Sequence, residues 1–522
     1  MQGVPQPGPD RFRHGVASFD PGQDRVLLWT LVDGGGPLRW LATADETGRQ
    51  VVAEGEAAAD PVSGVVTVDV EGLSPATTYW YRFEAGDERS PVGRTRTLPA
   101  DGAQRIRIAA TCCARYAQEE FGVYGALAAV DVDLVVHLGD YIYEDDKGDK
   151  RPTEPDRTLV SLDDYRARHA LHRRDPHLQA LHAAHPMVSV WDDHDLADNA
   201  WRDGAKSHDP DEHGPWAERK AAAIQAHHEF LPKRLADAGD LSTPWRRLDA
   251  GDLVSVLLTE TRAHRDEPVG ATEDEDVDDP DRTILGPEQR AWLLEQVTDP
   301  TPRWMVVVSG TVVSELEFPA PDALDGAMPE KYAVKDGLAR NSDQWDGYPA
   351  ERSALAAALA ERGGPTLVLS GDIHSAWAVE GLRDGEGRAT AVELVCPPAA
   401  TTPAGKLLPP GLGAALGAAL TRSIEGARWV DLDHYGFVVV ELEHDQATAT
   451  WWWVDPEDHT AARPARTWRI QGGERPSLVE PRRRRGLWRF AAAAVAAAVL
   501  VVLVTRRLRA SRPLSLPLVG DP

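Results

Sequence analysis

The chain has 522 residues, of which 42% are hydrophobic, and this is enough for two or more domains with a sizeable core. Its formal net charge is −27, and because residues 482–522 carry +8, residues 1–481 carry −35. So acidic a body disfavours nucleic acid as the main partner, and three cysteines, two of them adjacent, provide no disulfide framework.

Residues 12–100 have the pattern of a β-rich domain that follows a short tail at 1–11. Alternating or β-branched runs at 25–30, 38–41 and 66–70 are separated by clusters of Gly, Asp and Pro. A Leu-Ser-Pro turn then leads into an alternating aromatic strand, which is typical of a fibronectin-type sandwich with Tyr79 or Tyr81 as its corner tyrosine. We expect a fibronectin-like β-sandwich with a structural or docking role, because it contains no titratable cluster.

From Arg105 onward, strand patterns alternate with helix patterns, which predicts an α/β domain with a layered sheet over residues 101–475. The predicted helices are 121–130, 217–238, 287–297 and 353–362. The predicted strands are 253–258, 304–308, 437–442 and 448–454. Three polar stretches at 143–160, 198–216 and 319–350 are long enough to be functional loops.

Four short apolar runs in this domain are each followed at once by metal-binding residue types. They are 134–138 before GDYIYE (139–144), 186–190 before WDDHD (191–195), 366–369 before SGDIH (370–374), and 105–110 before Thr111-Cys112-Cys113. Functional side chains gather at the carboxyl ends of strands in open α/β sheets. We therefore expect these groups to meet at one sheet edge and to form a metal site.

Each of these residues also has a structural interpretation. Asp140 would cap a loop, Tyr143 would pack in the core, Cys113 would be an inert buried thiol, and His374 would be a buried histidine with a hydrogen-bond partner. The joint occurrence of such residues at four strand ends favours the metal site.

Together, GDYIYE, WDDHD and SGDIH resemble the alkaline phosphatase D (PhoD-like) metallophosphoesterases. Further segments resemble the family at 15–20, 26–30, 260–262, 285–289 and 343–349. Residues 112–116 resemble the family pattern Ser-Cys-Gln-x-Tyr, with Cys112 in place of Ser and Ala114 in place of Gln. The resemblance covers residues 12 to about 470. It implies a metallophosphoesterase-type layered sheet with helices and a metal-dependent site.

The resemblance also implies a role for each ligand. Asp140 would bridge two metals, and Cys113, Tyr143 and His374 would complete the shell of the first. A thiolate and a phenolate favour Fe³⁺. Asp193 and Asp372 would hold the second metal, where carboxylates suit Ca²⁺, although another divalent cation is an alternative.

The same resemblance directs His194 toward the scissile phosphate, with Asp195 holding its imidazole. His194 would stabilise charge or protonate the leaving oxygen, while a hydroxide between the metals attacks phosphorus. Asn199 and Arg262 are candidates for contacts to phosphate or to the ligands, and a loop turn and a surface ion pair are their alternatives.

These roles predict a monomeric phosphoesterase that hydrolyses phosphomonoesters and phosphodiesters. The alternative is a catalytically degenerate protein of the same fold that binds a phosphorylated ligand or a lipid headgroup at the membrane. The presence of all the expected ligands and of His194 favours the enzyme.

Residues 476–522 lie outside the resemblance and predict a basic linker, a membrane anchor and a tail. An apolar run from Phe490 to Val504 is flanked by arginines, and counting from Gly486 to Thr505 gives twenty residues. A buried helix is the alternative. Since the N-terminal residues show no signal-peptide pattern, we expect a single C-terminal transmembrane helix with the catalytic body facing the cytoplasm. An extracytoplasmic body is the other topology.

Overall fold

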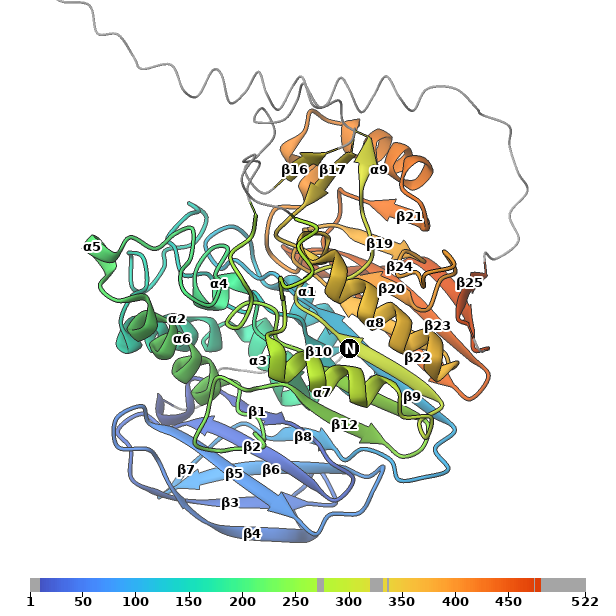
Figure 1. Cartoon of the computed structure of the whole chain (residues 1–522). Helices are drawn as coiled ribbons and strands as arrows, with labels where there is room; N and C mark the ends of the chain where they lie inside the picture. Colours follow the sequence, from blue (N-terminus) through green and yellow to red (C-terminus); the bar gives the residue numbers. More distant parts are fainter. Residues whose placement is uncertain (1–9, 270–276, 320–331, 336–337, 474, 480–522) are drawn as a thin grey trace, which may run out of the picture.

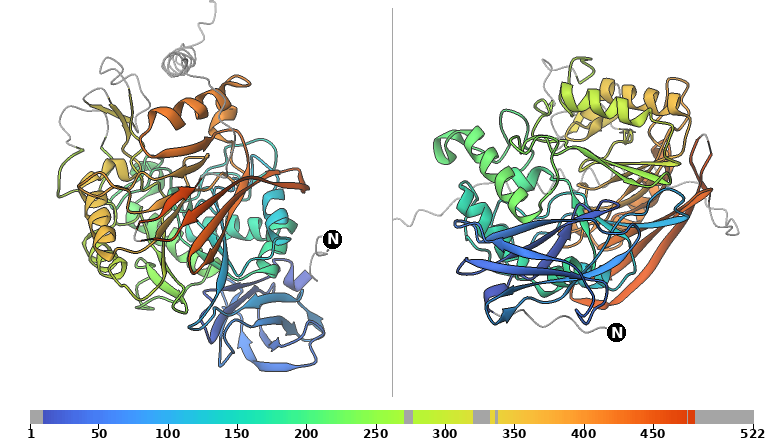
Figure 2. Two further views of the ribbon diagram at one scale, coloured as in Figure 1. Left: turned by 90° about the vertical axis from the view of Figure 1, so that its right-hand side faces the viewer. Right: turned by 90° about the horizontal axis from the view of Figure 1, so that it is seen from below.

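The computed structural model describes residues 10–269, 277–319, 332–335, 338–473 and 475–479. Two large β-sheets pack face to face, and helices cover their outer faces (Figure 1). A smaller sheet near the N-terminus packs against one end of the first large sheet (Figure 2). The predicted architecture of mixed sheets and helices is thus present.

The first sheet has ten strands, and its central strands β9, β10 and β11 run parallel. In spatial order the strands are β25 (Ser477–Val479), β24 (Asp458–Gln471), β23 (Gln446–Asp455), β22 (Gly436–Glu443), β9 (Arg105–Thr111), β10 (Leu134–His137), β11 (Met187–Ser189), β1 (Val16–Phe19), β2 (Arg25–Leu31) and β5 (Val65–Glu71). The short apolar runs of the sequence form these central strands because both faces of the sheet are covered.

The second sheet has seven strands, and its parallel neighbours are β13, β14, β18 and β20. In spatial order its strands are β12 (Arg246–Ala250), β13 (Val254–Leu258), β14 (Trp304–Val308), β18 (Thr366–Ser370), β20 (Val392–Val395), β19 (Ala376–Val379) and β21 (Ala427–Asp431). Three further strands, β15 (Phe318–Pro319), β17 (Leu338–Asn341) and β16 (Tyr332–Lys335), form a small sheet.

The main core lies between the two large sheets. Ile106 and Ile108 of β9 belong to one buried cluster with Trp304 and Val306 of β14. Alternate residues of the first sheet, such as Val135, contact the helices instead.

Helices cover both outer faces. The helices on the side of the first sheet are α1 (Gly122–Ala128), α2 (Leu162–Arg173), α3 (Pro176–Ala184), α4 (Asp193–Leu196), α5 (Pro210–His213) and α6 (Trp216–Phe230); those on the other side are α7 (Pro287–Val297) and α8 (Pro349–Arg362), and α9 (Leu412–Ser423) packs on β21. Short 3₁₀ helices are η1 (Asp10–Phe12), η3 (Trp345–Gly347) and η4 (Ala404–Leu407).

Most predicted elements of the second domain are present with shifted ends. Strand β14 and helix α7 have the predicted bounds. The helix predicted at 217–238 ends at Phe230, because Pro232 has no N–H to continue it. Helices α2, α3 and α9 were not predicted.

The predicted β-sandwich is present, but one of its two sheets belongs to the ten-stranded sheet. Its separate sheet comprises β4 (Val51–Ala58), β3 (Pro37–Thr43), β6 (Thr78–Ala85), β7 (Glu88–Arg89) and β8 (Gly93–Arg96). The facing sheet is β1, β2 and β5, and Phe19 of β1 pairs in parallel with Met187 of β11. Of the two candidate corner tyrosines, Tyr79 accepts a hydrogen bond from the Ser74 backbone N–H at 2.9 Å.

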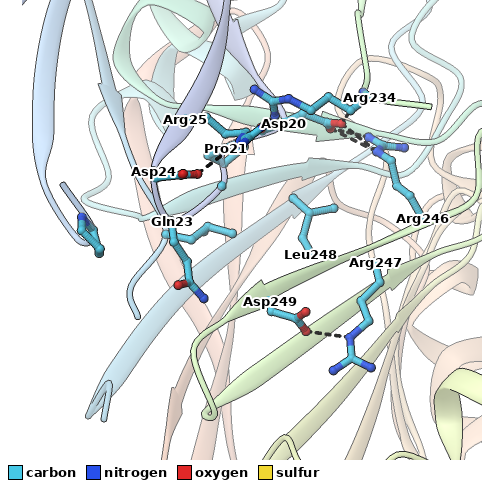
Figure 3. A pocket seen from close by; sticks show the side chains of 13 residues that line it. Asp20, Pro21, Gln23, Asp24, Arg25, Arg234, Arg246, Arg247, Leu248 and Asp249 are labelled. Atoms are coloured by element: carbon cyan, nitrogen blue, oxygen red, sulfur yellow. Dashed lines mark hydrogen bonds and ion pairs between the residues drawn. The ribbon is translucent and has the colours of Figure 1, made fainter. Parts of the chain in front are cut away.

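Charged contacts fasten the sandwich to the rest of the chain at a pocket of about 510 Å³ (Figure 3). Asp20, at the end of β1, accepts hydrogen bonds from the Arg246 guanidinium at 2.6 Å and from the Arg234 backbone N–H at 2.8 Å. Trp29 donates to the Glu229 carbonyl at 2.8 Å. The sandwich is therefore continuous with the second domain in hydrogen bonding as well as in packing.

Among the described residues, no helix has the length and hydropathy required to cross a membrane. The predicted anchor from Gly486 to Thr505 lies outside the described residues.

Candidate functional site

The four sequence motifs meet at the carboxyl ends of strands from both large sheets. Strands β9, β10 and β11 of the first sheet lead into Cys113, GDYIYE and WDDHD, and β18 of the second sheet leads into SGDIH. A parallel bridge between Cys112 and Pro398 joins the chain after β9 to the chain after β20. The expected single sheet edge is therefore wrong, and the site lies where the ends of two packed sheets meet.

Several of the same residues have an unusual backbone conformation, with a positive φ angle. Seven non-glycine residues of the described chain have positive φ, and five of them are candidate site residues: Cys113 (57°), Asp140 (54°), Asn199 (54°), Asp372 (67°) and His374 (49°). A non-glycine residue in the left-handed region costs about 1–3 kcal/mol and is found mostly where the surrounding structure imposes it for function.

Four predicted ligands form a first cluster. One ligand atom from each of Cys113, Asp140 and His374 lies within 4.8 Å of the others. The Tyr143 hydroxyl donates to Asp140 Oδ2 at 2.7 Å and lies 3.4 Å from His374 Nε2. Thr401 donates to the same phenol oxygen at 3.0 Å. Sulfur, nitrogen, carboxylate and phenol donors thus converge on one point.

Burial raises the pKa of the Cys113 thiol and of the Tyr143 phenol well above their ordinary values. Without a cation both groups stay protonated, whereas a bound cation makes the thiolate and the phenolate the favoured forms. The donor set therefore fits a highly charged metal ion.

A second cluster of carboxylates adjoins the first. Asp140, Asp193 and His194 form one group of close ligand atoms, and Asp192, Asp193 and Asp372 form another. Asp140 therefore belongs to the first cluster and to one of these groups.

Arg262 lies among these carboxylates and its side chain is fully buried. Its guanidinium pairs with Asp192 and lies 2.9 Å from Asp343, 3.5 Å from Asp193 and 3.3 Å from Asp372. Arg262 therefore orients the carboxylates from behind, which favours the ligand-contact alternative over a direct phosphate contact.

Asn199 contacts the site through its backbone. Its N–H donates to Asp193 Oδ2 at 2.6 Å, in the turn where φ is positive. This contact positions one carboxylate of the second cluster.

The expected pairing of His194 with Asp195 is wrong. His194 Nδ1 lies 2.6 Å from Glu144 Oε2, and its ring lies 4.2 Å from the Tyr143 ring between centroids. Asp195 instead accepts hydrogen bonds from the backbone N–H groups of Asp140, Tyr141, Ile142 and Asp192 at 2.8–3.1 Å. Asp195 thus holds the loop that carries Asp140.

Electrostatics favour a charged pair between His194 and Glu144. Burial lowers the pKa of His194, but Glu144 and neighbouring aspartates reverse this and leave it well above the ordinary value. Burial raises the pKa of Glu144, but the His194 cation and three hydrogen bonds lower it overall. His194 is therefore a protonated group at the site, with a side chain that is 14% exposed.

Glu144 and Arg115 are among the site residues that the sequence reasoning missed, together with Asp192, Asp343 and Thr401. Glu144 directly follows Tyr143 in GDYIYE, so the motif contained the signal. Arg115 pairs with Asp145, and its guanidinium carbon lies 3.8 Å from the centre of the Tyr143 ring. A cation over this ring favours the phenolate form of Tyr143.

The family model described as PhoD-like phosphatase matches residues 108–451, and the model of the PhoD-like phosphatase N-terminal domain matches residues 2–99. Alkaline phosphatase D of Bacillus subtilis (strain 168) is 35% identical over 399 residues, which cover 70% of this chain and 65% of that protein. The matched region therefore spans slightly less than two thirds of that relative.

A solved structure described as "Structure of PhoD" is similar over 97% of this chain and 100% of its own, with a TM-score of 0.78 and 27% identity. The likeness includes both the N-terminal sandwich and the two-sheet body.

Proposed function

Because the chain belongs to the PhoD-like phosphatase family, we propose that it is a metal-dependent phosphoesterase that hydrolyses phosphomonoesters and phosphodiesters. The observation that carries the proposal is the convergence of Cys113, Asp140, Tyr143 and His374 beside the Asp193 and Asp372 carboxylates. The likeness to an alkaline phosphatase supports the same reaction class.

We assign Fe³⁺ to Cys113, Asp140, Tyr143 and His374, because thiolate and phenolate ligands suit a ferric ion. We assign Ca²⁺ to Asp140, Asp193 and Asp372, because hard carboxylate oxygens suit it. When bound, such ions supply Lewis acidity and lower the pKa of water.

The chain's own residues supply the remaining chemistry. His194, held by Glu144 at 2.6 Å, donates a proton to the leaving oxygen. Asp195 keeps Asp140 in place through the backbone of residues 140–142. Arg262 fixes the carboxylates of the second cluster and offsets part of their mutual repulsion.

The test is turnover of bis-p-nitrophenyl phosphate and p-nitrophenyl phosphate by the purified protein, with the metals removed and restored one at a time. We expect hydrolysis that is lost on chelation and recovered with Fe³⁺ and Ca²⁺ together. Tight binding of these compounds without turnover under every metal condition would favour the catalytically degenerate protein instead.

We further propose that residues 486–505 anchor the protein in a membrane and that the catalytic body, a monomer, faces the cytoplasm. The apolar run between arginine clusters in the sequence supports the anchor, whereas the arginines on its two sides nearly balance and do not determine the orientation. Protease treatment of intact, wall-stripped cells tests it, since the N-terminal sandwich should survive until lysis. Digestion without lysis would place the body outside, and extraction of the protein by alkaline carbonate would contradict the anchor.

A further inference from the structure

Arg173, the last residue of α2, is a buried cation that forms no ion pair with a carboxylate of the described residues. Its side chain is 0% exposed. Within the described residues, none of its three guanidinium nitrogens makes a hydrogen bond of normal geometry, and no carboxylate forms an ion pair with it. The guanidinium carbon lies 4.1 Å from the centre of the Trp29 ring, and the phenols of Tyr141 and Tyr81 are the polar groups that interact with the guanidinium.

The groups around Arg173 are neutral and have unused hydrogen-bonding capacity. His169 lies one helical turn before it, with both ring nitrogens buried and unpartnered. His182 of α3 binds the Tyr141 hydroxyl through Nε2 at 2.9 Å, while its Nδ1 is unpartnered. Burial lowers the pKa of His169 to about 3, so this side chain adds no charge at neutral pH.

Two carboxylates that interact with Tyr141, those of Asp175 and Asp195, are bound to other groups. Asp175 pairs with Arg151 at 2.7 Å and accepts from the His177 backbone N–H at 2.9 Å. Asp195 accepts the four backbone hydrogen bonds described above. Neither is placed to neutralise Arg173.

Energetics require a partner for this charge. Burying an ion costs several kcal/mol even after relaxation. A desolvated cation–π contact returns about 2 kcal/mol, which is the contribution expected from Trp29. The cation–π contact therefore offsets only part of the free energy of burying the charge. A bound diffusible anion would offset the rest.

We propose that Arg173, together with Tyr141, His169 and His182, binds a monovalent inorganic anion of the size of chloride. One positive charge calls for one negative charge, which disfavours the doubly charged phosphate that the active site would process. A halide also accepts hydrogen bonds from N–H and O–H groups in any direction, so it suits donors that come from a loop and two helices.

The anion site lies directly behind the active-site loop. Tyr141 follows Asp140 in GDYIYE, and its backbone N–H is held by Asp195. Occupancy should therefore stabilise the folded protein and this loop. The inference does not depend on the proposed activity, because stability and anion occupancy are its readouts.

The first test is thermal unfolding of the metal-loaded full chain in sodium chloride against sodium gluconate at equal ionic strength. Gluconate is too large for a buried site. When chloride reaches a hundred times its Kd, we expect the melting temperature to rise by about 2–3 °C. Arg173→Met should lose this response, whereas Arg174→Gln, at the neighbouring and partly exposed position, should keep it.

The second test does not need a variant. Crystals of the wild-type protein grown in sodium bromide should show an anomalous bromide peak next to the Arg173 guanidinium. Equal melting temperatures in both salts, or a water or empty density at that position in bromide crystals, would overturn the proposal. If Arg173→Met does not fold, the presence or absence of the bromide peak in wild-type crystals is the test of anion binding at Arg173.

Discussion

Replacing Glu144 by Gln tests the contact that orients His194. Glu144 Oε2 lies 2.6 Å from His194 Nδ1, while Oε1 accepts from the Asp198 backbone and the Ser207 hydroxyl, both at 2.8 Å. Gln keeps the shape and an acceptor for the latter two donors but removes the charge. A hydrogen bond to a charged group contributes about 1.5–3 kcal/mol. We therefore expect kcat/KM to fall roughly 10- to 150-fold while metal content stays unchanged.

The pH profile supplies a second readout. A proton donor must be protonated, so the rate falls as pH rises through the pKa of His194. Burial lowers this pKa and Glu144 is the largest contribution that raises it. Glu144→Gln should therefore move the basic limb of the kcat/KM profile to lower pH.

Two further variants serve as controls for the effect of Glu144→Gln. His194→Ala should lower turnover by roughly 10²–10⁴-fold with metal retained. Asp195→Asn should lower the melting temperature and metal content, because Asp195 holds backbone N–H groups of residues 140–142. If Glu144→Gln keeps wild-type kcat/KM and pH profile while Asp195→Asn shifts the profile, the assignment of Glu144 is refuted.

The remaining predictions concern the metals and acid stability. Asp140→Ala should remove both metal and activity, as measured by elemental analysis and a diester assay. Normal turnover by a metal-free variant would contradict the proposed mechanism. Tyr143→Phe should shift or abolish a visible ferric charge-transfer band, whereas Cys112→Ser should leave it nearly unchanged; fully active protein that contains only zinc would contradict ferric ligation. Burial lowers the pKa of His137 and His169 to about 3, so their stabilising contribution is present above pH 6.5 and is lost as pH falls toward 3. Together they should cost about 4 kcal/mol between pH 8 and pH 5, and equal urea midpoints at the two pH values would rule this out.

The sequence predicted that the candidate ligands lie at strand ends, because each motif that contains them follows a short apolar run. Cys113, Asp140 and Asp372 each lie within three residues of the end of such a run, and their prediction as ligands came from the joint pattern and the family resemblance. The meeting of two sheets could not, because strand order depends on contacts such as that between Cys112 and Pro398, far apart in the chain.

Two other features escaped prediction for physical reasons. The partner of His194 depends on the directions of side chains, which the sequence does not show. Asp195, which is adjacent in sequence, was therefore predicted in place of Glu144. Helices α2 and α3 were missed because their buried faces carry histidines such as His169 and His182, which look polar in sequence but are neutral inside the protein. Periodicity of apolar residues alone therefore did not reveal them.

The ten-stranded sheet also determines the order in which the chain can assemble. Its central strand β9 pairs with β22, which is synthesised more than 300 residues later. At typical translation rates that gap lasts roughly 15–65 s, during which one edge of β9 has no partner. Unpaired apolar edges promote association between chains, and such long-range pairing slows folding. The strand pairing that positions Cys113 in the candidate metal site can therefore be completed only late, after nearly all of the described chain has been made.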